Sequence, residues 1–146
     1  MSLRAGLREE AVLLDLVRTV DLLSRPFVQL FKAEGLSGTQ YNVLRILRGA
    51  RGAGLTCGEI AGRMLTRDPD ITRLLDRMEQ RGLVARSREE RDRRVVLTRI
   101  TENGLEVVGR LDEPVREAHR KLLGHMGAER LAALSELLSA CREGLN

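Results

Sequence analysis

The sequence predicts a mainly α-helical fold that carries one small β-hairpin. Apolar residues recur at helical spacing through most of the 146-residue chain. Capping residues, glycines and prolines divide this periodic pattern into separate helices. One β-branched run, residues 95–100, follows an arginine-rich turn, which is typical of a hairpin. A chain of this length suits a single domain, residues 1–146, with one core and a helical extension.

The first helix is predicted over residues 9–33, and it carries two apolar stripes. One stripe consists of Leu13, Val17, Val20, Phe27 and Phe31, and the other of Leu16, Leu23 and Leu30. Pro26 lies inside the pattern, so the helix should kink or restart there. Because two stripes need cover on more than one side, we expect this helix to pack against its own chain and against a partner subunit.

Two short helices should follow. Ser37 or Thr39 can cap the first, which ends before the glycine-rich loop 49–54. Thr56 and Glu59 have the spacing of a capping box, which predicts the start of the second.

A longer helix comes next, with Asp68 as its N-cap and Pro69 at its first position. It should end near Arg81, because Gly82 follows. Its core face holds Ile71, Leu74, Leu75 and Met78. Its opposite face holds Asp70, Thr72, Arg73, Arg77 and Gln80.

Two short strands, residues 83–87 and 95–100, should form the hairpin around a polar turn at 88–94. Five arginines gather at this turn and its edges, namely Arg86, Arg88, Arg91, Arg93 and Arg94. Asp92 lies among them, where its carboxylate can order the tip by pairing with Arg94. The hairpin therefore ends in a cationic tip, which suits the negative potential of a DNA groove.

Two more helices complete the predicted fold. Thr101 should cap a long helix that is kinked at Pro114. A last helix should span residues 128–142, where Cys141 occupies an apolar position and is expected in the core.

The order short helix, turn, capped helix and hairpin predicts a winged helix-turn-helix. In that arrangement the second helix enters the major groove of DNA and the hairpin reaches the neighbouring backbone or minor groove. Arg73 and Arg77 are four residues apart and point the same way, so one can fork onto guanine while the other holds a phosphate. Thr72 can contact a phosphate or a thymine methyl, and Asp70 can accept from cytosine N4 or orient Arg73. The candidate DNA-binding residues are Arg67, Asp70, Thr72, Arg73, Arg77, Arg91, Arg93 and Arg94.

Composition narrows the classes of partner. The formal net charge is +4 and the pI is about 9.8, yet residues 101–146 carry only six basic against eight acidic side chains. The positive surplus therefore lies in the first hundred residues, as expected of a protein that presents one end to a polyanion. Aromatic residues make up 2% of the chain, too few for the stacking platforms that bind single strands.

No catalytic triad, phosphate-binding loop or dinucleotide glycine pattern is found, so we expect neither an enzyme nor a cofactor. His119 and His125 are six apart and lack an Asp/Cys ligand set, so we expect no metal site. No apolar run approaches the roughly 20 residues of a membrane span. With no signal-peptide pattern either, we expect a cytoplasmic protein that does not bind membranes.

Three segments together resemble the MarR family of regulators. Residues 70–84, DITRLLDRMEQRGLV, look like the family's recognition helix. Asp92-Arg93-Arg94 and Ile100-Thr101-Glu102-Asn103-Gly104 look like its wing signature, D-x-R followed by L-T-x-x-G. The resemblance covers nearly the whole chain.

The resemblance implies an obligate homodimer that binds a pseudo-palindrome in double-stranded DNA. Residues 9–35 and 101–146 would form the dimerisation helices, and residues 36–100 the DNA-binding lobe. Arg94 would be the wing arginine that Asp92 orders. Family members typically repress nearby genes and release DNA when a small anionic or phenolic effector binds between these parts, or when a cysteine is oxidised.

Two features depart from the family pattern. The recognition helix begins with Asp68, Pro69 and Asp70 where many relatives have Ser or Thr, so the base preference of relatives does not carry over. The first long helix has no cysteine near its start, which speaks against the peroxide-sensing mechanism.

Some residues also admit a plainer interpretation. Arg73 and Arg77 can form a solvated face paired with Asp70, Asp76 and Glu79. Charged residues are ordinary on the surface of a helix, and such pairs are weak.

Tyr41 and Cys57 are candidates for regulation. Tyr41 is the only phenol, and it can line a ligand pocket or simply pack in the core. Cys57 starts a helix, where a thiolate is favoured, and is a candidate redox site or a half-buried structural thiol. The alternative functions are a winged-helix protein-interaction module without DNA binding and a thiol-redox-switched regulator.

Overall fold

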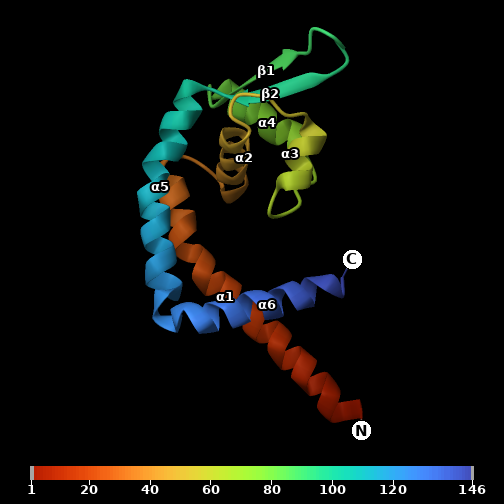
Figure 1. Ribbon diagram of the computed structural model, residues 1–146, viewed down its shortest axis with the longest axis vertical. Coiled ribbons are helices and arrows are strands. Elements are labelled where there is room, and N and C mark those ends of the chain that lie inside the picture. Colours follow the sequence, from red (N-terminus) through yellow and green to blue (C-terminus); the bar gives the residue numbers. More distant parts are fainter. Residues whose placement is uncertain (1, 146) are drawn as a thin grey trace. The chain divides into compact units, whose positions relative to one another are not determined.

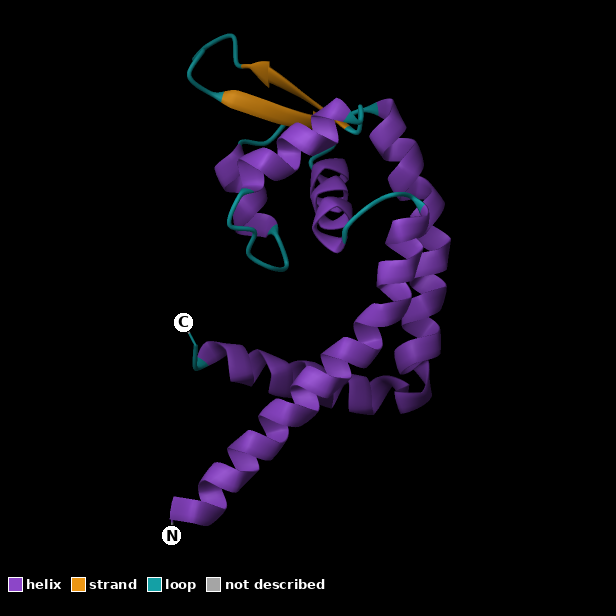
Figure 2. Cartoon of the chain, turned by 180° about the vertical axis from the view of Figure 1, so that it is seen from behind, coloured by secondary structure: helices purple, strands orange, loops and turns teal. Residues whose placement is uncertain are grey.

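The computed structural model describes residues 2–145, with side chains from residue 7 onward. Its elements are α1 (Ser2–Ala33), α2 (Gly38–Gly49), α3 (Cys57–Arg63), α4 (Ile71–Gln80), β1 (Val84–Arg88), β2 (Val96–Ile100), α5 (Glu102–Leu123), the 3-10 turn η1 (Gly124–Met126) and α6 (Gly127–Glu143) (Figure 1). The strands pair antiparallel, with Val84 opposite Ile100 and Arg88 opposite Val96. The mainly helical class with one hairpin is therefore confirmed (Figure 2).

The chain divides into two compact units. One comprises Met1–Leu23 with Glu113–Asn146, and the other comprises Ser24–Asp112. Helices α1 and α5 contribute to both units, and each passes through its proline, Pro26 or Pro114, as a single helix. The restart that we allowed at Pro26 is therefore absent.

The unit Ser24–Asp112 has its own apolar core. Its fully buried apolar side chains are Val43, Leu44, Leu47, Ile60, Leu75, Met78, Leu83, Val84 and Val108. A short bridge adds to the hairpin, because the backbones of Leu55 and Thr98 exchange hydrogen bonds of 2.9 and 2.8 Å. This core fixes α2, α3, α4 and the hairpin as one body.

Local capping explains where α2 and α3 begin. Ser37 and Gln40 form one capping box, and Thr56 and Glu59 form the other. In each box the hydroxyl accepts a backbone hydrogen bond while the longer side chain accepts one from the capping residue's own N–H. The predicted start of α3 at Thr56 is confirmed, and of the two candidate caps for α2, Ser37 and Thr39, the structure has Ser37.

The prediction for the start of α4 was wrong by about two residues. The helix begins at Ile71, and the N-cap is Asp70, whose Oδ1 accepts from the backbone N–H of Arg73 at 3.1 Å. Asp68 instead accepts from the N–H of Asp70 at 2.8 Å and turns the chain ahead of the helix. Both aspartates have cap-like chemistry, so sequence spacing alone does not decide between them.

The start of α5 is packed tightly against the end of the α4–β1 turn. Thr101 Oγ1 donates to the carbonyl of Gly82 at 2.6 Å and accepts from the N–H of Gly104 at 3.0 Å. A Cβ at Gly104 would lie 2.2 Å from the carbonyl oxygen of Leu83. The T-x-x-G sequence is therefore a capped helix start that only glycine allows to approach so closely.

The other unit is built from helix segments that leave many apolar side chains exposed. On α1 these are Leu7, Val12, Leu13, Leu14, Val17, Val20 and Leu22. Helix α6 has no buried residue, and Cys141, which we expected in the core, is exposed. That expectation failed because an apolar helical position is buried only where another element covers it. Within residues 2–145, no helix is both long and apolar enough to cross a membrane.

Candidate nucleic-acid interface

Helix α4 separates its apolar and cationic residues onto different sides. Leu75 and Met78 are fully buried, whereas Thr72, Arg73 and Arg77 are exposed. The spacing of four residues puts the two arginines on one face, as the sequence predicted. Because the buried side is anchored in the core, the cationic side is held rigidly toward solvent.

Arg73 and Arg77 do not form the ion pairs with neighbouring acids that the plainer interpretation of this face expected. Within the described part of the chain, neither Arg73 nor Arg77 has a side-chain hydrogen bond or ion pair. The acids that would have paired with them are otherwise engaged, since Asp70 caps the helix while Asp76 and Glu79 hold Arg86.

The hairpin tip is ordered by its one aspartate. Asp92 accepts from Arg94 through the backbone N–H at 3.1 Å, Nε at 3.1 Å and Nη2 at 3.2 Å. The hydrogen bonds from the Arg94 guanidinium, followed by the one from its backbone, lower the pKa of the Asp92 carboxyl. The Arg94 side chain nevertheless stays 91% exposed, so the pairing that we expected leaves its cation at the surface.

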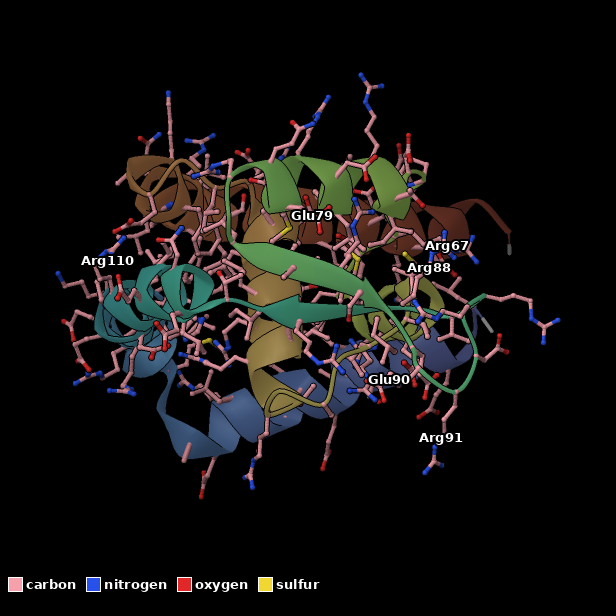
Figure 3. All side chains as sticks on the ribbon, turned by 90° about the horizontal axis from the view of Figure 1, so that it is seen from above. Arg67, Glu79, Arg88, Glu90, Arg91 and Arg110 are labelled. Carbon is pink, nitrogen blue, oxygen red and sulfur yellow. The ribbon has the colours of Figure 1, made fainter. Side chains whose placement is uncertain are left out.

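The remaining predicted cations surround this tip and the start of α4. Arg91 and Arg93 are exposed, and Figure 3 shows Arg91 projecting outward from the turn. Arg88 donates to the carbonyl of Arg93 at 2.7 Å and so braces the turn. Arg67 is exposed in the connection between α3 and α4. The candidate residues therefore lie on α4, just before it, and on the hairpin.

Arg86 departs from the prediction, because it does not belong to the cationic tip. Its guanidinium binds Asp76 and Glu79 of α4. A signal was present in the sequence, since Arg86 lies two residues from buried Val84 and so shares the inward face of β1. We missed it because the tip arginines were grouped by proximity along the chain.

Arg81, at the end of α4, makes a second connection that sequence analysis missed. Its Nη1 donates to the carbonyl of Gly35 at 2.5 Å and its Nη2 to that of Glu34 at 3.2 Å, just after α1 ends. The Glu34 carboxylate accepts from Arg110 at 2.9 and 3.1 Å, and this side-chain hydrogen bond lowers the pKa of Glu34. No local pattern joins residues so far apart in sequence.

Tyr41 is buried and Cys57 is half-buried. Tyr41 is 8% exposed, its ring stacks on Phe31 at 4.2 Å, and its hydroxyl accepts from Arg45 at 3.2 Å. Cys57 is half-buried at the first position of α3. Among the described residues, no group of three or more His, Cys, Asp or Glu side chains is placed to hold a metal ion.

The fold is that of a winged-helix protein, a class in which such a helix and hairpin typically contact DNA. A sequence model of the MarR family matches residues 36–96. The Escherichia coli homoprotocatechuate degradative operon repressor is 31% identical over 114 residues, which cover 78% of this chain and 74% of the repressor. The chain therefore belongs to the MarR family of transcription regulators.

Solved structures agree with this assignment. A MarR transcription factor from Planctomyces limnophilus is 40% identical, with a TM-score of 0.70 over 90% of this chain and 95% of that one. Bordetella bronchiseptica BpsR has the same fold at 21% identity, with a TM-score of 0.77 over 87% of this chain and 89% of that one. The structure of BpsR was described in connection with regulation of its DNA binding by 6-hydroxynicotinic acid.

Proposed function

We propose that this protein is a homodimeric repressor that binds a pseudo-palindromic sequence in double-stranded DNA and releases it when a small anionic or phenolic effector binds. The observation that carries the proposal is the state of Arg73 and Arg77. Both guanidinium groups are exposed on a rigid helix, and every acid on that helix is already engaged elsewhere. Free, preoriented guanidinium groups are the commonest readers of guanine and of phosphate.

The hairpin supplies the second half of a DNA-binding surface. Arg91, Arg93 and Arg94 are exposed at its tip, where they can contact the backbone or enter a narrow minor groove. Asp92 holds the turn in one conformation, which lowers the entropy lost on binding. The helix would supply most of the base selectivity and the tip most of the phosphate contacts.

Exposed apolar residues of α1 support the homodimer. Val12, Leu13, Val17 and Val20 are between 56% and 63% exposed in the single chain. Contiguous apolar surface of this kind marks a protein-protein contact. A two-fold dimer would present two copies of α4 and read half-sites about one helical turn apart.

The names of relatives support the repressor role and the effector class. One relative is called the repressor of a homoprotocatechuate degradative operon, and BpsR is linked to 6-hydroxynicotinic acid. Homoprotocatechuate and 6-hydroxynicotinic acid are both hydroxylated aromatic acids. Tyr41 is the residue we assign to such a ligand's surroundings, and the effector would act by favouring a spacing of the two α4 helices that no longer fits DNA.

Selection from a randomised duplex pool tests DNA binding. Wild type should enrich an inverted repeat. Arg73→Ala should lose or relax sequence preference, whereas Arg94→Ala should weaken binding more uniformly, because phosphate contacts carry no sequence information. Arg130→Ala, an exposed arginine of α6, is the matched control and should behave as wild type.

The selected duplex then allows the effector to be tested. Hydroxylated aromatic acids should release the protein from this duplex, and Tyr41→Phe should shift the concentration required. Absence of any enriched sequence, with no binding even at low salt, would exclude the DNA-binding function and favour a protein partner.

A further inference from the structure

In addition to the apolar core that they share, strand β1 and helix α4 are joined by the hydrogen bonds of one arginine, Arg86. The backbone N–H of Arg86 donates to Glu79 Oε2 at 2.8 Å, and its Nε and Nη2 donate to Glu79 Oε1 at 3.2 and 2.9 Å. Its Nη2 also donates to Asp76 Oδ1 at 2.5 Å. Four hydrogen bonds therefore join one residue of the hairpin to two acids one turn apart on α4.

The cluster of Arg86, Asp76 and Glu79, called the joint below, differs from an ordinary surface ion pair. The Arg86 side chain is only 21% exposed, and it shares both carboxylates at once. Charge-assisted hydrogen bonds from one planar guanidinium to two acceptors define direction as well as distance. The hydrogen bonds from Arg86 lower the pKa of the Glu79 carboxyl, which keeps this acid ionised as the acceptor of the joint.

We propose that Arg86, together with Asp76 and Glu79, is a positioning device that sets the angle of the hairpin relative to α4 and so places the tip arginines on DNA. Arg86 itself does not contact DNA in this proposal. The inference rests on the proposed DNA-binding function. Arg86, Asp76 and Glu79 affect DNA binding only through the position of the tip arginines.

A small rotation of the hairpin at its root, where β1 begins, produces a large displacement of its tip. Strand β1 has five residues, Val84–Arg88, so the tip lies roughly 17 Å from the root at about 3.3 Å per residue. A rotation of about 10° at the root would move the tip by ~3 Å, as far as a whole hydrogen-bond length. Arg91, Arg93 and Arg94 at the tip would then miss the phosphates that a fixed hairpin reaches.

The joint also explains why two acids are tolerated on a DNA-facing helix. Asp76 and Glu79 would repel phosphates if they were unpaired, but each shares the cation of Arg86. Neutralising Asp76 or Glu79 therefore has opposite expected effects on DNA affinity under two explanations. Simple electrostatics predicts tighter DNA binding after an acid is neutralised, whereas the positioning role predicts weaker binding.

Glu79→Gln is the decisive variant, and Glu90→Gln is its matched control. Glu90 is an exposed acid of the hairpin turn for which the described structure shows no side-chain hydrogen bond or ion pair (Figure 3). On the selected duplex, Glu79→Gln should bind about five-fold more weakly, since charge-assisted hydrogen bonds to Arg86 are lost. Glu90→Gln should bind as tightly as wild type or more tightly. Equal or tighter binding by Glu79→Gln overturns the proposal.

A comparison of two backgrounds separates positioning from direct contact. In the wild-type background, Arg86→Gln should weaken binding and lower the magnitude of the slope of log K against log salt, because the tip arginines then miss their phosphates. In a chain that already carries Arg91→Gln, Arg93→Gln and Arg94→Gln, Arg86→Gln should change neither the affinity nor the slope, because no tip cation is left to place. A further fall of the slope by about 0.9 in that background would show that Arg86 is itself a phosphate contact and would overturn the proposal. Arg86→Lys should recover part of the lost affinity.

Hydrogen exchange gives a test that needs no DNA. In Glu79→Gln, the Arg86 amide and its hairpin neighbours should exchange faster, while amides of α2 keep their protection at an unchanged melting temperature. Unchanged exchange in the hairpin overturns the joint even if the wild type binds no DNA. Failure of the wild type to bind any duplex, with faster hairpin exchange in the variant, would remove the proposed function and leave the joint standing.

Discussion

The two compact units of this chain treat their apolar residues in opposite ways. Among the described side chains, fifteen of the sixteen buried apolar residues lie in Ser24–Asp112, and only Val115 lies in the other unit. Nine of the twelve large exposed apolar residues lie in that other unit, Met1–Leu23 with Glu113–Asn146. The winged-helix unit therefore has its own apolar core, while the helices of the second unit expose apolar side chains.

If the chain forms the proposed homodimer, its folding and association are coupled in the unit that exposes this apolar row. Burying a valine or leucine side chain contributes about 1.5–3 kcal/mol, so leaving a whole row exposed is unfavourable for a single chain. A second copy that covers the row would recover this free energy. The unit Ser24–Asp112 needs no such help, because its helices and hairpin bury each other's apolar faces.

The largest effect is expected from breaking the apolar row of α1. Leu13→Glu combined with Val17→Glu should weaken dimerisation at least about a hundred-fold, because four charges in total would enter the two-fold interface. Sedimentation over a concentration series measures the change. Leu65→Glu is the control, since Leu65 is 87% exposed but lies in the other unit. If the double variant still sediments as wild type does, the row is not the dimer interface.

A smaller effect is expected within the finished unit, at Gly104. Gly104→Ala would put a methyl group 2.2 Å from the carbonyl oxygen of Leu83, so it should lower the free energy of unfolding by about 2 kcal/mol. Gly109→Ala, on the same helix, has nothing within 4 Å of the added Cβ and should raise it by ~0.5–1 kcal/mol. Denaturant unfolding of both variants measures the difference. Equal shifts in the two variants would contradict the close approach.

The smallest effect concerns two threonines of the same unit, Thr98, which is buried, and Thr101, which is half-buried. Thr98 Oγ1 has no hydrogen-bond partner among the described atoms, so Thr98→Val should raise the free energy of unfolding by about 1 kcal/mol. Thr101→Val should lower it by ~1–2 kcal/mol, because Thr101 Oγ1 caps α5 and donates to Gly82. Thermal unfolding should therefore move in opposite directions for the same chemical change. A lower melting temperature for Thr98→Val would mean that its hydroxyl is satisfied.

Much of the fold was predictable because its signals are local. Thr56 and Glu59 are three positions apart, and α3 begins where their capping box predicts, while α2 begins after Ser37, one of the two predicted caps. The hairpin was likewise predicted from a β-branched run next to a polar turn. The start of α4 was misplaced because Asp68 and Asp70 have equal chemistry, and only the backbone conformation separates the turn from the cap.

At the candidate site, the sequence placed Arg73 and Arg77 correctly but Arg86 wrongly. The exposed side of α4 follows from helical periodicity, so Arg73 and Arg77 were located correctly on a solvent-facing side. Their roles on DNA, like those of the tip arginines, remain predictions for the experiments above. Arg86 was misassigned because it was grouped with the tip arginines by proximity along the chain, although its alternation with Val84 puts it on the inward face of β1. Its partners, seven and ten residues earlier, are decided by the packing of β1 on α4.

What the sequence by itself determined is the set of helices and strands, the caps other than that of α4, the two cationic segments and the family. These depend on residues within about four positions of each other, whose interactions the backbone geometry already dictates. Only the tertiary structure decided which arginines are free and which are bound. Arg86 and Arg73 are chemically identical, but the packing of β1 on α4 brings Asp76 and Glu79 to Arg86 and leaves Arg73 in solvent. Packing likewise decided that Gly104 must be glycine, because a contact with Leu83 depends on how two segments meet rather than on either one alone.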